Sequence, residues 1–259
     1  MYTWLKLWVA LVILAGLAGC NALTDQQRAM LLEGERAFRD KQYEHAAGQM
    51  SDFLSQVNNR PEAARALYTR GMARAMLGQR AWAYADLQRA AQETTDPDLT
   101  WQPHAALGIL YFEDDNWEAA ARALGSAVER MPSMIPKDAL LFRLGVCYER
   151  TGHWSAASGP FRRIVSEFPQ GAYAATAERR LQLNADHFAV QCGVFAHIEN
   201  ANQLVERLRK SGLRPYVRPE ERKGSSCYVV LEGRYGSFAE ANQSLARVRT
   251  HVADAVLWP

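Results

Sequence analysis

The sequence predicts an all-α helical solenoid followed by a small α+β domain of order βαββαβ, in which two helices cover one face of a four-stranded antiparallel sheet. Two observations lead to this division. A glycine-centred pattern recurs every 37 residues through the first part of the chain, and from about residue 187 the apolar spacing changes from helical to alternating. The 259 residues are enough for two modest domains that each bury a core.

The N-terminus has the pattern of an export signal. Lys6 precedes an uncharged apolar run, residues 7–18, which is shorter than the roughly 20 residues of a spanning helix. The run ends in Leu-Ala-Gly-Cys at residues 17–20, which resembles the bacterial lipobox. This resemblance implies a lipoprotein signal peptide at residues 1–19 and acylation of Cys20.

The segment after the lipobox bears on destination. Residues 20–27 are expected to be the lipidated N-terminus and a tether. The position after Cys20 holds Asn21 and not an aspartate. By resemblance to Gram-negative lipoproteins, this favours a lipid anchor in the outer membrane that faces the periplasm. The alternative is a soluble secreted protein in which Cys20 has no such role.

The charge balance gives no support to nucleic-acid binding. The chain has 30 Lys and Arg against 28 Asp and Glu, and the predicted signal removes only Lys6. A nearly neutral chain lacks the cation excess that neutralises phosphates.

Four copies of one helical hairpin are predicted across residues 28–185. The repeated positions are Gly34, Gly71, Gly108 and Gly145; twelve residues later Ala46, Ala83, Ala120 and Ala157; and bulky Met50, Leu87, Leu124 and Phe161. A small residue in each of two antiparallel helices lets their axes approach, and a bulky residue one turn away fills the gap. Pro132 and Pro169 stop the third and fourth copies.

The pattern resembles the tetratricopeptide repeat, best seen in "ALGILYFEDDNWEAAARALGSAVERMP" and "RLGVCYERTGHWSAASGPFRRIVSEFP". That repeat is about 34 residues long, so each copy here carries about three more, and longer helices or inter-repeat loops are expected. Residues 171–183 are expected to form a helix that caps the stack.

The resemblance implies a groove that holds a protein partner and is lined by the first helix of each repeat. Its expected lining is Tyr68, Met72, Ile109, Phe112, Phe142 and Val146. The alternative for each of these side chains is packing against the neighbouring repeat.

Residues 186–259 are predicted to form the α+β domain. Strands are expected at 188–195, 213–219, 227–235 and 254–258, and helices at 199–212, ended by Gly212, and 237–251, capped by Ser237. With both helices on one face, the opposite face of the sheet is expected to be open to solvent.

This region resembles the SPOR domain. The matching residues are Gln191, Gly193, Phe195, Gly212, Gly233, Tyr235, Glu240 and Ala241. The resemblance implies binding to peptidoglycan, preferentially to glycan strands that amidases have stripped of stem peptides.

Strand alternation predicts which side chains lie on the open face. Gln191, Tyr216, Arg218 and Trp258 are the expected glycan contacts, with Val194 and Val229 on the same face. The alternative for Gln191 is a solvated strand residue. Many SPOR domains carry an aromatic residue or arginine on the third strand, where this chain has Cys227, Val229 and Leu231; this departure from the family pattern bears on the strength of glycan binding.

No pattern for catalysis, a cofactor or a metal stands out. Cys192 has His187 and His197 nearby, but alternation places its thiol on the core side, away from substrate. Phosphate-binding loops, H-E-x-x-H and paired-cysteine spacings are absent from the sequence. A disulfide between Cys192 and Cys227 stays open, because an oxidising periplasm permits it although the two side chains are expected on opposite faces.

The sequence therefore predicts a non-catalytic adaptor that binds peptidoglycan and a protein partner, in cell division or cell-wall organisation. The alternative is a subunit of an outer-membrane assembly or secretion complex, in which the repeats do the work. An enzyme is the third and weakest hypothesis.

Overall fold

The computed structural model describes residues 22–57, 60–222 and 224–259. The predicted signal peptide, Cys20 and Asn21 lie outside these residues. Contacts divide the chain into two compact units, one up to Pro103 and one from His104. None of the helices in the described part is long and apolar enough to cross a membrane.

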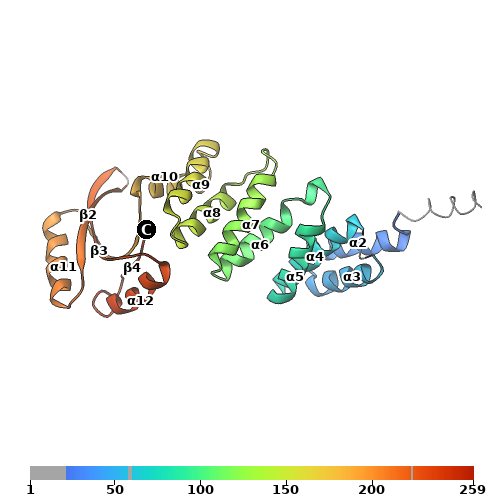
Figure 1. The fold of residues 1–259 in the computed structure, drawn as a ribbon, viewed down its shortest axis with the longest axis horizontal. Coiled ribbons are helices and arrows are strands. Elements are labelled where there is room, and N and C mark those ends of the chain that lie inside the picture. Colours follow the sequence, from blue (N-terminus) through green and yellow to red (C-terminus); the bar gives the residue numbers. More distant parts are fainter. Residues whose placement is uncertain (1–21, 58–59, 223) are drawn as a thin grey trace, which may run out of the picture. The chain divides into compact units, whose positions relative to one another are not determined.

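The first unit holds two helical hairpins. They are α2 (Asp25–Arg39) with α3 (Tyr43–Gln56), and α4 (Pro61–Met76) with α5 (Arg80–Glu93), followed by the 3-10 helix η1 (Pro97–Leu99) (Figure 1). Thr24 and Gln27 form a capping box at the start of α2. The core of this unit gathers Met50, Phe53 and Leu67, which are fully buried.

The second unit begins within α6 (Gln102–Glu113), which pairs with α7 (Trp117–Arg130). A further hairpin follows in α8 (Asp138–Arg150) and α9 (Trp154–Glu167), and then α10 (Ala174–Leu183) packs on α9. The helical-repeat fold is confirmed, and α10 lies within the segment expected to form the capping helix.

Each hairpin has a glycine at which its two helices lie in close contact. A Cβ placed on Gly34, Gly71, Gly108 or Gly145 would lie 2.5, 2.8, 2.6 and 2.5 Å from Met50, Leu87, Leu124 and Phe161, respectively. The 37-residue pattern thus records one steric requirement four times. At each of these positions only a residue without a side chain leaves room for the bulky residue of the partner helix.

The turn inside each hairpin repeats as well. Lys41, Gly78, Asp115 and Gly152 all have positive φ, between 57° and 76°. Two of the four are not glycine, so the left-handed turn was not visible in the glycine pattern. The segments between hairpins include residues 94–101 and 131–137, and α4 has 16 residues against 12 in α6.

The C-terminal module (residues 188–258) has the predicted order βαββαβ (Figure 1). Its elements are β1 (Phe188–Phe195), α11 (Ile198–Lys210), β2 (Pro215–Arg222), β3 (Ser225–Tyr235), α12 (Phe238–Arg249) and β4 (Val256–Trp258). The sheet order is β2-β3-β1-β4, and each neighbouring pair is antiparallel. A register shift between Gln191 and Gly193 marks a bulge in β1.

The core of the module lies between the sheet and the two helices. Val190, Cys192 and Val230 from the sheet meet Leu204 and Leu208 from α11 there. Gly212, with φ of 76°, ends α11 as predicted. The helices therefore cover one face, and we call the opposite face of the sheet the distal face.

Ser237 caps α12 as predicted, because its side chain accepts a hydrogen bond from the Glu240 amide at 3.3 Å. Replacing Ser237 with alanine is expected to cost about 1 kcal/mol, since one amide of the first turn loses its acceptor. Hydrogen exchange at the first-turn amides of α12 should accelerate, while exchange in α11 serves as the control. Unchanged protection in α12 would contradict the cap.

Candidate functional site

The distal face carries the side chains predicted to lie there, Val194 among them because the bulge in β1 shifts the alternation after Cys192. Gln191 pairs with Leu231, which pairs with Tyr216; Val194 pairs with Val229, which pairs with Arg218. These residues therefore form two rows that cross β1, β3 and β2. Cys192 and Val230 face the helices instead. The predicted face of each of these side chains agrees with the structure, whereas their roles as glycan contacts stay predictions.

The distal face is not open along its whole length, and here the expectation was wrong. Leu183, the last residue of α10, packs with Ala189, Val229, Leu231 and Trp258 in one buried cluster. As a result Val229 is 0% and Trp258 only 2% exposed, so neither side chain offers a contact surface in this structure. We call Leu183 and the segment after it, residues 184–187, the cover.

The local backbone explains how the cover reaches the sheet. Asn184 follows α10 in the left-handed region, with φ of 43°, and β1 begins at Phe188. The short connection brings the end of α10 onto the sheet that it precedes. Arg218 fixes this arrangement, because its guanidinium donates to the Leu183 carbonyl and lies 4.7 Å from the centre of the Trp258 ring.

A polar network occupies the uncovered part of the distal face. Glu220 accepts hydrogen bonds from Trp258 Nε1 and from Arg222 Nε, both at 3.0 Å. Arg222 also donates to Gln191 Oε1 at 2.9 Å. Exposed Val194 and Val256 lie on the same face. Glu220 and Arg222 were missed because the predicted strand ended at residue 219, although the alternation of β2 continues to both.

A second network lies where the cover enters β1. Nδ1 of His187 contacts Asp186 Oδ1 at 2.5 Å, and its Nε2 contacts the Tyr216 hydroxyl at 2.8 Å. Arg234 reaches both Asp186 oxygens at 3.2 Å. The hydrogen bond with His187 lowers the pKa of the Asp186 carboxyl, and burial raises the pKa of Tyr216. The network thus joins the cover to β2 through His187 and Tyr216.

The Cys192 thiol is shielded from solvent. Cys192 is 7% exposed and lies on the helix side, and burial, with a smaller effect of Glu232, raises its pKa to about 12. Cys147, Cys192 and Cys227 are free, with Cys192 and Cys227 on opposite faces of the sheet. Among the described residues, no three His, Cys, Asp or Glu side chains are grouped to hold a metal ion.

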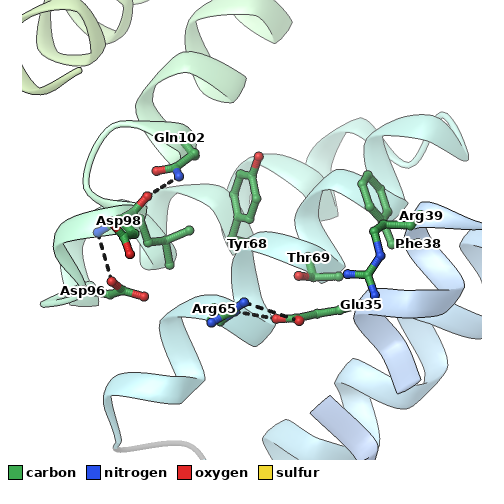
Figure 2. A pocket seen from close by; sticks show the side chains of 10 residues that line it. Glu35, Phe38, Arg39, Arg65, Tyr68, Thr69, Asp96, Asp98 and Gln102 are labelled. Atoms are coloured by element: carbon green, nitrogen blue, oxygen red, sulfur yellow. Dashed lines mark hydrogen bonds and ion pairs between the residues drawn. The ribbon is translucent and has the colours of Figure 1, made fainter. Parts of the chain in front are cut away.

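The residues predicted for a partner groove fall into both units. In the first unit, Tyr68 lines a pocket of about 300 Å³ and Met72 is half-buried nearby on the same helix. Figure 2 shows Tyr68 in this pocket with the Arg65–Glu35 ion pair, whose closest atoms are 2.5 Å apart. Burial raises the pKa of Tyr68.

In the second unit the predicted groove residues are partly engaged by the chain itself. Phe142 stacks on Tyr173, with ring centres 4.8 Å apart, and Phe112 meets Trp117 edge-on at 5.2 Å. Ile109 is half-buried, whereas Val146 is 8% exposed and buried. Val146 therefore packs within the repeats, which was the alternative interpretation.

Aromatic side chains join the last hairpins to the C-terminal module. The ring centres of Trp154 and Phe188 are 4.8 Å apart, and those of Trp117 and Phe238 are 6.3 Å apart. The Arg150 guanidinium lies 3.5 Å from the centre of the Phe238 ring. Trp117 and Trp154 occupy the same position in successive repeats, so the equivalent residue of two repeats contacts the module.

Solved structures similar to this chain contain helical repeats. A tetratricopeptide repeat protein from Parabacteroides merdae ATCC 43184 is 13% identical with a TM-score of 0.53, covering 72% of this chain and 68% of that one. Residues 41 to the end of MamA from Desulfovibrio magneticus RS-1 are 17% identical with a TM-score of 0.51, covering 63% and 85%. These similarities show the fold alone. None of the curated proteins compared with the chain matches it.

Family models match two segments of the second unit. Residues 184–258 match the SPOR domain and residues 138–171 match a tetratricopeptide repeat. Both are binding modules, and they support a peptidoglycan-binding, protein-interacting role; SPOR domains occur in periplasmic envelope proteins. The chain therefore carries a SPOR domain at residues 184–258 behind a helical-repeat region that includes a tetratricopeptide repeat at residues 138–171.

Proposed function

We propose that this protein is a non-catalytic adaptor that binds denuded glycan strands of peptidoglycan through its SPOR domain and a protein partner through its repeats. The observation that carries the glycan proposal is the position of Gln191. It lies on the distal face outside the cover, next to Arg222, and its described hydrogen bond uses only Oε1. Its amide N–H groups therefore remain for sugar hydroxyl or carbonyl oxygens.

The uncovered part of the distal face suits a sugar chain in other respects. Val256, which pairs with Gln191, is 44% exposed, and Val194 in the neighbouring row is 40% exposed, so both offer apolar contact beside Gln191. Arg222 and Arg218 supply cations for the carboxylates of a denuded strand. We propose Gln191, Val194, Tyr216 and Arg218 as contacts, with Tyr216 and Arg218 at the edge of the cover.

The setting of this activity is also a proposal. The predicted division into a signal peptide, a tether at residues 20–27, repeats at 28–185 and the SPOR domain at 186–259 suits a lipoprotein acylated at Cys20. The outer membrane, facing the periplasm, is the proposed location, and cell division or wall organisation is the proposed process. The pocket around Tyr68, with its paired Arg65 and Glu35, supports a peptide partner that carries both apolar and charged groups.

The test is binding of the full chain to purified sacculi, with and without amidase treatment. Amidase-treated sacculi should bind more protein, and Gln191→Ala should weaken this binding by about tenfold, equivalent to about 1.4 kcal/mol. Gln243→Ala is the matched control, because Gln243 is exposed on α12, on the opposite side of the sheet. A wild-type chain that is indifferent to both kinds of sacculi would overturn the proposal.

A second candidate is a subunit of an outer-membrane assembly or secretion complex. The observation that favours it is the cover, which removes Val229 and Trp258 from the surface that a ligand could reach. In that case a protein lacking the SPOR domain should still copurify with its membrane partners. Loss of those partners on deletion would favour the adaptor.

A further inference from the structure

A cavity of about 650 Å³ lies between α9, the cover and the SPOR sheet. Trp154 and Arg162 reach it from α9, Asn184 and Asp186 from the cover, and Arg218 and Arg234 from the sheet. It is therefore built by a repeat helix and the SPOR domain together. Because Arg218 also lies on the distal face, the cavity adjoins the surface proposed above for glycan.

The lining of this cavity has more positive than negative charge. Three arginines, Arg162, Arg218 and Arg234, face one carboxylate, Asp186. Arg234 is engaged with Asp186, and Arg218 donates to the carbonyl of Leu183. The described partner of Arg162 is a neutral hydroxyl, Ser158 Oγ, at 2.7 Å. The charge of Arg162 is thus uncompensated by its described contacts, which favours an anionic ligand.

The walls beside Arg162 combine an aromatic ring with short polar groups. Trp154 is half-buried, and its ring packs against that of Phe188 with the ring centres 4.8 Å apart. Ser155 and Ser158 line the cavity from the same helix, and Asn184 lines it from the cover. An aromatic ring suits the apolar face of a sugar ring, and hydroxyl and amide groups suit its hydroxyls.

We propose that this cavity binds an acidic amino sugar of the glycan strand, with Arg162 paired to the sugar's free carboxylate. The inference rests on the proposed function and adds a reason for preferring denuded strands. In an intact strand the lactyl group is joined to the stem peptide by a neutral amide. Hydrolysis of that amide leaves a carboxylate on the sugar and releases the peptide with its amine, so the group that Arg162 recognises exists only after cleavage.

The test compares Arg162→Gln with Arg163→Gln in the full chain. Arg163 is the neighbouring residue on α9, but it pairs with Glu167 at 2.7 Å and does not line the cavity. Arg162→Gln should bind amidase-treated sacculi about tenfold more weakly than the wild type does. Its binding to untreated sacculi should be unchanged. Arg163→Gln should bind both as the wild type does. Arg162→Lys, which keeps the charge, should retain part of the binding.

Soluble competitors identify the anion. N-acetylmuramic acid should displace the wild-type chain from treated sacculi and act weakly on Arg162→Gln, whereas N-acetylglucosamine, which lacks the acid, should act weakly on both. Inorganic phosphate that competes while N-acetylmuramic acid does not would overturn the assignment to an acidic sugar.

The outcomes separate this inference from the proposed function. If Gln191→Ala weakens binding and Arg162→Gln does not, the cavity is not a glycan site, and the SPOR proposal stands. Equal losses for Arg162→Gln and Arg163→Gln would reduce the effect to general charge and overturn the inference. If the wild-type chain binds neither kind of sacculi, both proposals fail together.

Discussion

Replacing Leu183 with alanine is expected to destabilise the second unit by about 2–5 kcal/mol, the usual cost of removing a leucine from a packed core. Leu183 is 8% exposed and packs with Val229, Leu231 and Trp258 on the distal face. The truncation would leave these apolar side chains facing a cavity or water. Urea unfolding of the full chain, followed by circular dichroism, measures the loss.

The same variant has a local readout. Cys227 is half-buried against the Leu183 cluster, whereas Cys192 is buried on the opposite side of the sheet. Alkylation located by mass spectrometry should accelerate at Cys227 and remain slow at Cys192. Leu32→Ala is the matched control, because Leu32 is 58% exposed and should change stability by no more than about 0.5 kcal/mol. Similar stabilities for the two variants would contradict the cover.

Replacing Gly145 with alanine is expected to destabilise the last hairpin by about 2 kcal/mol. The added Cβ would lie 2.5 and 2.6 Å from two carbons of the Phe161 ring. Phe161 is 2% exposed and packs against Phe142, so its ring cannot move aside without disturbing α8. Overpacking of this kind costs about 1–3 kcal/mol, which exceeds the gain of up to about 1 kcal/mol from replacing a helical glycine.

Gly125→Ala supplies the opposite expectation in the neighbouring hairpin. Gly125 lies inside α7, and a Cβ there would meet nothing within 4 Å. That variant should gain up to about 1 kcal/mol, because the favourable helix propensity of alanine comes without a clash. Thermal unfolding of both variants gives the comparison. If both replacements changed the stability in the same direction, the repeated glycines would not be explained by steric contact with the partner helix.

The repeat frame was predictable because each copy states the same contact in the same positions. Gly145 and Phe161 are 16 residues apart, and their contact follows from two adjacent antiparallel helices. The turns were less visible, since Lys41 and Asp115 adopt a left-handed conformation that the sequence marks only in the copies with Gly78 and Gly152. The repetition, rather than any single residue, carried the signal.

The strands of the SPOR domain were predictable for a similar reason. Side chains alternate along a strand, so Gln191 and Cys192 had to face opposite sides whatever the rest of the chain did. The limit was the end of β2. Pro219 was read as its last residue, yet the strand continues and places Glu220 and Arg222 beside Gln191.

The sequence by itself determined the four hairpins, the order of strands and helices, and the face on which each strand residue lies. These follow from local periodicity, which any stable packing of the chain must satisfy. Only the tertiary structure decided how much of the distal face a ligand can reach and that Arg162 stands beside it. Both depend on how the end of α10 packs on Val229, Leu231 and Trp258, which lie far along the chain. A contact of that kind leaves no periodic trace in the sequence.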